Sequence, residues 1–416
     1  MINRAYKTQL DVNNSQQTLL LQHIGCARWA FNWALNKKKE AFDRKEKIPN
    51  AMDLHKELVR LKKSEIPWMY DSSKCSPQNA LRDCDQAFQN FFTRCKKKIN
   101  GSKGFPKFKS KKNDKQSFRL EGSIRVESNR IKLPMIGWVN LFEIGYIPTD
   151  HKILSATVSK RAGKWFVSVQ TESSDIEATT PKNDIIGVDL GIKNLATCSD
   201  GTTYHNPKAL KSKLERLKRR QRQFSRKQKG SKNKAKAKLK LTKIHYQISN
   251  IRKDCLHKVT SKIVHENQVI VLEDLNVKGM MSNHKLAQAI GDVGMGEFRR
   301  QIEYKAKWYG RTVCFADRFY PSSKLCSVCG VKKENLTLSD RVYECDGCGQ
   351  VSDRDMNAAI NLRQFYTAGL AGINASGDGS PVISVSLSHS LSMKEDSNMK
   401  SIDLPDKGDT YRLQSV

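Results

Sequence analysis

Three acidic positions in this sequence are spaced so that they could form one metal-dependent active site. Asp189 follows a run of four apolar or glycine residues and precedes a glycine turn, a pattern that predicts a buried strand ending in a carboxylate. Glu273 ends a second run of this kind, and Asp353 and Asp355 stand at the start of an apolar helical segment. Each acid alone could be an exposed turn residue. Because all three positions border core-forming segments, we expect the fold to bring them together.

Carboxylates that converge in this way repel one another unless a cation neutralises them. Mg²⁺ prefers oxygen ligands and takes one or two carboxylates together with water and phosphate oxygens. A pair of such ions can clamp the attacking and leaving oxygens when a phosphodiester is hydrolysed. The acids therefore favour a magnesium-dependent enzyme that cuts nucleic acid.

Four of the eleven cysteines form the most specific metal-binding pattern in the chain. They make two CxxC pairs, Cys326 with Cys329 and Cys345 with Cys348, each followed by glycine and separated by fifteen residues. This spacing is typical of a zinc ribbon. Because four thiolates fill the coordination positions of tetrahedral zinc, we expect a structural ion and not a catalytic one. The other seven cysteines are scattered, and we expect them to be reduced thiols.

The charge of the chain indicates its partner. Lys and Arg number 74 against 42 Asp and Glu, which gives a formal net charge of +32. This excess suits a polyphosphate, so nucleic acid is the expected partner and an anionic membrane surface is the alternative. No apolar run reaches the roughly 18 residues that a membrane span needs, and the first residues lack the apolar region of a secretory signal. The sequence therefore predicts a cytosolic protein without membrane contact.

Two segments concentrate the positive charge. Between Lys208 and Lys243 there are seventeen Lys or Arg residues and a single acid. This composition predicts an exposed helix or helical hairpin, broken near Gly230, that contacts nucleic acid, with a solvated basic face as the alternative. Residues 94–119 mix lysines with aromatic residues that could stack on bases, or else form a solvated loop. Those aromatic residues are Phe105, Phe108 and Phe118.

Periodicity predicts the elements that must hold these side chains. Residues 4–12 form a strand, Ser15 caps a helix, and Ser76 caps a further helix with proline at its first position. Residues 120–172 alternate as antiparallel strands that, with the first strand, predict a small β-barrel or sandwich. From Asp184 onward, strands and helices alternate as in an RNase H-like α/β core. The tail from about residue 372 lacks periodicity and is expected to be disordered.

Four motifs together resemble the transposon-encoded TnpB (OrfB) proteins, which are relatives of the type V CRISPR effectors. In chain order they are GVDLGIK at 187–193, LEDL at 272–275, SSKLCSVCG at 322–330 and DRDMNAA at 353–359. The resemblance covers about residues 1–370, and no motif residue departs from the family pattern.

The resemblance implies a multidomain α/β protein. Its RuvC-like, RNase H-like nuclease core is split in three and holds an inserted zinc ribbon, and its N-terminal half is a β-barrel with an inserted helical unit. The implied parts are 1–14 (first strand of the barrel, or wedge, domain), 15–100 (helical recognition unit), 101–180 (rest of the barrel), 181–320 (RuvC-like parts I and II with the basic tract 208–243), 321–350 (zinc ribbon), 351–371 (RuvC-like part III) and 372–416 (tail).

The resemblance also implies an RNA-guided DNA endonuclease. Its catalytic, Mg²⁺-binding residues would be Asp189, Glu273 and Asp355, because the last motif of the family places its acid two residues before asparagine, here Asn357. Asp353 is the second choice. The implied partners are a guide RNA made from the transposon end and double- and single-stranded target DNA, bound by a monomer as a ribonucleoprotein. A non-cutting RNA-guided DNA-binding repressor and a strand-transferring transposase remain as alternatives.

Overall fold

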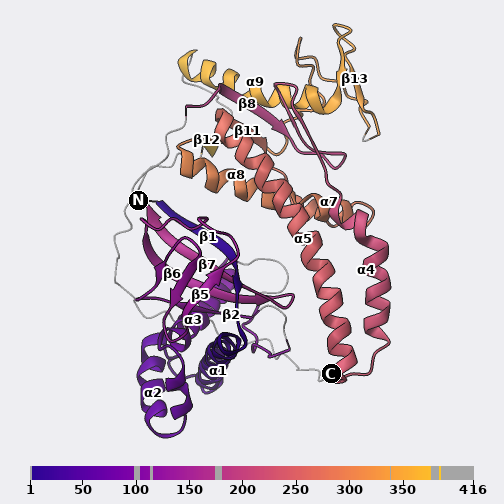
Figure 1. The fold of residues 1–416 in the computed structure, drawn as a ribbon. Coiled ribbons are helices and arrows are strands. Elements are labelled where there is room, and N and C mark those ends of the chain that lie inside the picture. The colour runs from indigo at the N-terminus through magenta and orange to yellow at the C-terminus, as the bar shows by residue number, and fades with distance from the viewer. Residues whose placement is uncertain are drawn as a thin grey trace.

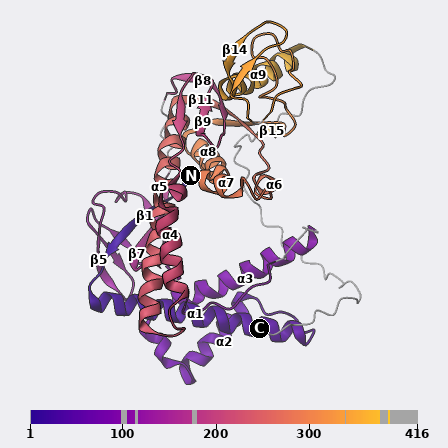
Figure 2. The ribbon, with the colours of Figure 1, turned by 90° about the vertical axis from the view of Figure 1, so that its right-hand side faces the viewer.

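The structure is a computed structural model of the chain and describes residues 2–97, 104–112, 116–173, 180–337, 339–375 and 384–385. Two lobes, each built on its own β-sheet, are joined along one side by a long helical hairpin (Figures 1 and 2). Within the described residues, no helix has both the length and the apolar character that a membrane crossing requires.

The N-terminal lobe contains a seven-stranded antiparallel sheet in the order β2-β6-β7-β1-β5-β4-β3. The predicted union of the first strand with the later ones is confirmed, because β1 pairs with both β5 and β7. A closed barrel is not what the described residues show, since β2 and β3 stand at opposite ends of the strand order. The strands are β1 (Ile2–Asp11), β2 (Gln116–Leu120), β3 (Arg125–Val126), β4 (Arg130–Leu133), β5 (Gly137–Leu141), β6 (Lys152–Arg161) and β7 (Lys164–Ser173).

Helices lie in sequence between β1 and β2 and share one apolar core with the sheet. They are α1 (Asn14–Asp43), α2 (Ala51–Ser64), the short 3₁₀ helix η1 (Pro67–Asp71) and α3 (Cys75–Lys96). Residues four apart on α1, such as Leu20 and Ile24, are buried and make the helix face the core. Phe118, grouped above with possible stacking residues, is also buried in this core.

Both predicted helix caps in this lobe are wrong. Asn13, not Ser15, caps α1: its side chain accepts a hydrogen bond from the Gln16 amide at 2.8 Å, and the Gln16 side chain accepts one from the Asn13 amide. Helix α3 begins at Cys75, and the Ser76 hydroxyl is turned into the core, where it donates to the carbonyl of His23. The Ser76 side chain, which the local sequence predicts as a helix cap, is therefore used in a contact between helices.

The C-terminal lobe is built on a sheet in the order β10-β9-β8-β11-β12-β15, in which β8, β11 and β12 run parallel. Helices α5 and α8 pack on one face with Ile186, Ile270 and Val313, and α9 covers the other face with Val269 and Cys314. The elements are β8 (Asn183–Asp189), β9 (Asn194–Cys198), β10 (Thr203–His205), α4 (Ala209–Ser225), α5 (Lys232–Glu266), β11 (Asn267–Glu273), α6 (Val277–Met280), α7 (Ala287–Val293), α8 (Met295–Tyr309), β12 (Thr312–Ala316), β13 (Val342–Glu344), β14 (Val351–Asp353), α9 (Arg354–Ala375) and β15 (Ser384–Val385).

The basic tract forms the predicted helical hairpin. Helices α4 and α5 pack against each other and turn at Gly230, whose φ of +91° lies in the left-handed region (Figure 1). Helix α5 continues beyond the basic tract to Glu266. The hairpin therefore runs without a break from its exposed basic tip to the strand that carries Glu273.

Some predictions fall on residues that the structure does not describe. These are Lys98, Lys103 and Lys115 of the basic segment and most of the tail, 376–383 and 386–416. Within the tail, Ser384–Val385 (β15) pairs with β12.

Candidate active site and metal centre

Asp189 and Glu273 end neighbouring parallel strands. The register pairs Val188 of β8 with Leu272 of β11, so the two acids that follow stand side by side at one edge of the sheet. Both side chains are half-buried. Runs of apolar residues, buried on both faces by helices, set these strands in the middle of the lobe and leave the acids at the rim.

The third acid arrives on α9. This helix crosses β8 at Gly187, where a Cβ atom would lie only 2.1 Å from the carbonyl oxygen of Ala359. The close approach brings the first turn of α9 to the loop after β8. A Cβ atom on Gly191 would lie 3.8 Å from Oδ2 of Asp355, which places this carboxylate beside the loop that follows Asp189.

The acids act on one another electrostatically. Burial raises the pKa of Asp189 well above its usual range, and the charges of Glu273 and Asp355 raise it further. Burial also raises the pKa of Glu273, against hydrogen bonding from Ser322 and the charge of Arg354. In the described part of the chain, none of the three carboxylates forms an ion pair. The charge of Arg354 lowers the pKa of Asp189 and of Glu273 but does not outweigh burial. A divalent cation would supply further positive charge to this group.

Asp353 has a different environment from Asp355. Its Oδ1 accepts hydrogen bonds from the backbone amides of Asp355 at 2.9 Å and Met356 at 3.1 Å. These are the contacts of a helix cap, and the Asp353 residue itself is exposed. Asp353 therefore caps the start of α9, while Asp355 lies beside the loop after Asp189 and raises the pKa of Asp189 more than Asp353 does.

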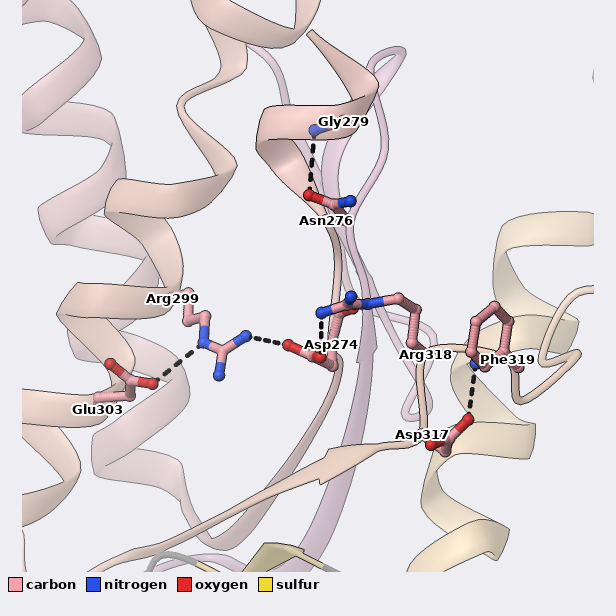
Figure 3. Close-up of polar contacts among 8 residues, drawn as sticks. All are labelled: Asp274, Asn276, Gly279, Arg299, Glu303, Asp317, Arg318 and Phe319. Carbon is pink, nitrogen blue, oxygen red and sulfur yellow. Dashed lines mark hydrogen bonds and ion pairs between the residues drawn. The ribbon is translucent and has the colours of Figure 1, made fainter. Parts of the chain in front are cut away.

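Asp274, next to Glu273, is fully engaged with two cations (Figure 3). Its Oδ1 contacts Arg299 Nη1 at 2.5 Å and its Oδ2 contacts Arg318 Nη2 at 2.7 Å. Hydrogen bonding from Arg299, followed by that from Arg318, lowers the pKa of Asp274. The side chain ties the loop after β11 to α8 and to the loop after β12, so it positions its neighbours and is not a free ligand.

The four predicted zinc ligands lie together. Their sulfur atoms are all within 4.8 Å of one another, and among the described residues this is the single group of three or more His, Cys, Asp or Glu side chains that meets this limit. The residues are Cys326, Cys329, Cys345 and Cys348. The three acids are spaced more widely, as expected of mutually repelling carboxylates.

The two CxxC turns have the same backbone construction. Gly330 and Gly349 adopt left-handed φ values of +74° and +69°, and each donates its amide to the carbonyl of the first cysteine of its turn. Amides of Cys348 and Gly347 lower the pKa of the Cys345 thiol to about 6. Because zinc binds thiolates, this donor set fits structural zinc, as the sequence predicted.

Asparagine side chains on α9 join the zinc-binding segment to the acids. Asn357 donates to the Leu325 carbonyl at 2.6 Å and accepts from the Ser327 amide at 2.9 Å. Asn361, one turn later, donates to the Ser322 carbonyl at 2.7 Å, and the Ser322 hydroxyl donates to the carboxylate of Glu273. The metal centre and the acidic site therefore share one hydrogen-bonded framework.

A basic cavity of about 550 Å³ opens at the loop that follows Asp189. Lys193, four residues after Asp189, lines it together with Arg341, whose carbonyl accepts a hydrogen bond from the Arg354 amide. The other cations that line it are Lys208, Lys211 and Lys285. Its carboxylate, Asp292, is already occupied by the amides at the start of α4 and by Arg252. The cavity thus offers positive charge to an anion near the loop after Asp189.

Sequence reasoning named the acids as candidates and missed the residues that support them. Asn357 and Asn361 had a signal, since polar residues four apart recur on one face of an apolar helix. Ser322 and Lys193 stand in the motifs quoted above, and Lys208 and Lys211 in the basic tract, but the contacts they make could not be foreseen because their partners are distant in the sequence. The seven remaining cysteines are free and at least half-buried, as expected.

Three family models match the chain. One described as "Probable transposase" (OrfB_IS605) matches residues 168–284, and one described as "Cas12f1-like, TNB domain" matches residues 296–362. A third, "Helix-turn-helix domain" (HTH_OrfB_IS605), matches residues 1–47. In the structure, residues 2–43 form one strand and one 30-residue helix.

Two relatives match over nearly their whole length. The protein from Streptomyces pristinaespiralis is 36% identical over 91% of this chain and 92% of its own. The protein from Escherichia coli K12 is 33% identical over 86% of this chain and 91% of its own. Both carry the name "Putative RNA-guided DNA endonuclease", followed in the second case by InsQ.

A solved structure shares the fold. The protein in the cryo-EM structure of the Cas12f1-sgRNA-target DNA complex matches with a TM-score of 0.51 at 15% identity. The match covers 85% of this chain and 83% of that chain. The architecture is therefore a mixed α/β multidomain fold like that of Cas12f1.

Proposed function

The chain belongs to the TnpB (OrfB) family of IS605-type transposon proteins, and from this we propose that it is an RNA-guided DNA endonuclease that hydrolyses phosphodiester bonds in its RuvC-like domain. The observation that carries the proposal is the meeting of Asp189, Glu273 and Asp355 at the end of the central strands. Within the described residues these carboxylates form no ion pair, and Lys193, in the loop after Asp189, lines a cavity with room for a phosphate-bearing chain.

The acids are proposed as ligands of Mg²⁺. Their oxygen donors suit a hard cation, and their spacing suits one or two carboxylates for each ion. Bound there, Mg²⁺ would act as a Lewis acid on the phosphodiester oxygens. Ser322 holds the Glu273 carboxylate in place, and Asp353 caps the helix that presents Asp355, so both side chains are oriented before any substrate binds.

The basic surfaces are proposed as nucleic-acid contacts. The cavity at Lys193 and Arg341 would hold phosphates of the strand to be cut, and the α4/α5 hairpin would follow the backbone of an RNA–DNA duplex. We propose a guide RNA from the transposon end and double- and single-stranded target DNA as partners, bound by one copy of the chain. The relatives' names and the complex in the Cas12f1 structure support these partners.

The division of the chain into parts is proposed along the same lines. The sheet and helices up to about residue 180 would form a wedge domain with an inserted recognition unit. Residues 181–320 and 351–371 would form the nuclease, residues 321–350 the zinc ribbon, and residues 372–416 a tail outside the nuclease.

The test is cleavage by protein that has been purified with RNA from cells carrying its flanking transposon DNA. With a matched target and Mg²⁺, the Asp189→Ala variant should lose cleavage and keep nearly all RNA binding. Asp184→Ala is the matched control, because Asp184 is an exposed acid at the other end of the same strand. Cleavage by Asp189→Ala at the wild-type rate would remove the assignment.

The alternatives give different results in the same preparation. Bound RNA and target binding without cleavage would indicate a non-cutting repressor. Joined DNA ends would indicate a strand-transferring transposase, which the "Probable transposase" description of the matching model favours. Absence of bound RNA from the wild-type protein would contradict the guided mechanism.

A further inference from the structure

Phe319 is a large apolar side chain held out into solvent. It lies in the loop that connects β12 to the first zinc-binding turn, and it is 88% exposed, the highest value for a large hydrophobic residue in the described part of the chain. An exposed aromatic ring on a mobile loop would need no explanation. The neighbours of Phe319, however, are firmly attached.

Each side of Phe319 is anchored to the protein, and Figure 3 shows the contacts of Asp317 and Arg318 on one side. The Phe319 amide donates to Oδ1 of Asp317 at 2.8 Å, and the Tyr320 amide donates to the Asp317 carbonyl at 3.0 Å. Arg318 is tied to Asp274, and the Tyr320 ring packs on Phe365 of α9 with centroids 4.8 Å apart. The loop thus fixes where the phenyl ring is presented.

The loop also lies next to the acidic site. Asp274, which holds Arg318, directly follows Glu273, and Ser322, three residues after Phe319, hydrogen-bonds to the Glu273 carboxylate. Along this edge of the sheet, β8 brings Asp189, β11 brings Glu273, and β12 leads to Phe319. The basic cavity at Lys193 lies toward β9, on the opposite side of Asp189.

We propose that Phe319 is a stacking platform for an unpaired base of the DNA strand that lies in the active site. A strand laid across the sheet edge would place phosphates in the basic cavity, its scissile bond at the acids, and a base on the phenyl ring. An aromatic face accepts every base, which suits an enzyme whose sequence selection is made by RNA. The inference rests on the proposed function and adds a substrate-contact residue to it.

The experiment compares Phe319→Ala and Phe319→Trp in the full-length protein loaded with its RNA. Phe319→Ala should raise the DNA concentration needed for half-maximal cleavage by roughly 5- to 100-fold, the range that loss of one base–aromatic stack gives. Phe319→Trp should restore the wild-type value, which a merely structural role for phenylalanine would not allow. Phe142→Ala is the control, because Phe142 is 70% exposed in the other lobe.

A second readout does not require cleavage. A single-stranded oligonucleotide containing 2-aminopurine is added to the full-length Asp189→Ala protein, and its fluorescence is expected to fall as the base stacks. The fall should persist with Phe319→Trp and be absent with Phe319→Ala. Equal fluorescence and equal half-saturation in Phe319→Ala and wild type would overturn the inference, and so would an apolar protein partner found on this residue in place of DNA. A wild-type protein that quenches 2-aminopurine but cuts nothing would contradict the proposed function and leave the platform supported.

Discussion

Asp353 and Asp355 are two residues apart, yet their hydrogen bonds give them different tasks. Asp353 accepts the free amides at the start of α9, and a helix start needs such an acceptor because its first amides have no partner within the helix. Asp355, in the first turn of α9, lies beside the loop that contains Gly191. The motif alone offered both acids as metal ligands, and their local contacts support the second.

Substitution by asparagine should separate these two roles. Asp353→Asn keeps a capping oxygen and should leave cleavage and stability close to wild type, whereas Asp353→Ala should cost about 0.5–2 kcal/mol of stability. Asp355→Asn removes a ligand charge and should reduce cleavage to background at unchanged stability. Thermal unfolding and a cleavage assay on the same preparations measure both effects. Cleavage lost in Asp353→Asn but kept in Asp355→Asn would reverse the assignment.

Gly187 should be intolerant of any side chain. A Cβ atom there would meet the backbone of Ala359 at 2.1 Å and that of Arg363 at 2.6 Å, so α9 would have to move away from β8. We expect Gly187→Ala to cost about 3 kcal/mol or more and to abolish cleavage, because Asp355 moves with the helix. Gly25→Ala, on α1 with no atom within 4 Å, should instead stabilise by about 0.5–1 kcal/mol. Denaturant unfolding of both variants tests the contrast.

At the scale of elements, α9 is the part on which the acidic site and the zinc-binding turns both depend. Its first turn presents Asp355, and one face of its next turns binds the backbone at Ser322 and Leu325 through Asn357 and Asn361. Unfolding of the zinc-binding turns would leave Asn357 and Asn361 without their partners and would remove the hydrogen bond from Ser322 to Glu273. Zinc would therefore influence cleavage without contacting DNA.

Removal of zinc should lower both stability and cleavage. We expect about one zinc ion per chain by elemental analysis, and loss of that ion in Cys345→Ser because three thiolates leave tetrahedral zinc incomplete. Cys255→Ser is the matched control, since this half-buried thiol on α5 lies outside the cluster. Full zinc content and full activity in Cys345→Ser would contradict the structural assignment.

The contact between α5 and α8 should make stability depend on pH. Lys305 is 4% exposed, donates to neutral oxygens of His257, Thr260 and Ser261, and burial lowers its pKa to about 8. An unfolded lysine has a pKa of about 10.4, so the unfolded chain binds more protons between these values. The free energy of unfolding should therefore gain on the order of 1–3 kcal/mol from this residue as pH rises from about 8 to about 10.

The comparison with Lys305→Met isolates this contribution, because other groups titrate in the same range. Urea unfolding at pH 7.5 and pH 10 should show the wild type gaining stability relative to the variant. A difference between the two proteins that does not change with pH would show that Lys305 keeps an ordinary pKa in the folded state.

At the scale of the whole molecule, positive charge is arranged as one long arm beside the acidic site. The α4/α5 hairpin carries most of the cations of the basic tract and reaches from the C-terminal lobe to the N-terminal lobe, where Lys238 donates to the carbonyl of Lys112 (Figure 2). Arg161 of β6 lies over the Tyr246 ring of α5 at 5.5 Å from its centroid. A bound duplex would therefore touch both lobes.

Binding of nucleic acid should fall steeply with salt. Each phosphate contact contributes a slope of about −0.9 for duplex DNA in a plot of log K against log salt concentration. Arg216→Gln and Arg219→Gln, exposed on α4, should together make the slope shallower by up to about two phosphate contacts. Lys56→Gln on α2, also exposed but outside the hairpin, should leave it unchanged. An identical slope for the double variant would place the duplex elsewhere.

Much of the architecture could be predicted because its determinants are local. The four cysteines lie within 23 residues, and a CxxC turn folds on itself, so zinc ligation followed from spacing alone. Apolar runs flanked by charged segments predicted the strands of the nuclease lobe and the acids at their ends. The basic composition of residues 208–243, interrupted at Gly230, predicted a helical hairpin because helix formation and chain reversal also depend on neighbouring residues.

What the sequence by itself determined was therefore the set of chemical groups: three carboxylates, four thiolates, a basic hairpin and a family. Only the tertiary structure decided which groups share a site and which serve them. The closeness of Ala359 to Gly187, the path from Asn361 through Ser322 to Glu273, and the exposure of Phe319 each join residues that are far apart in the chain. Such contacts depend on packing between complete elements, and no local pattern of residues encodes them.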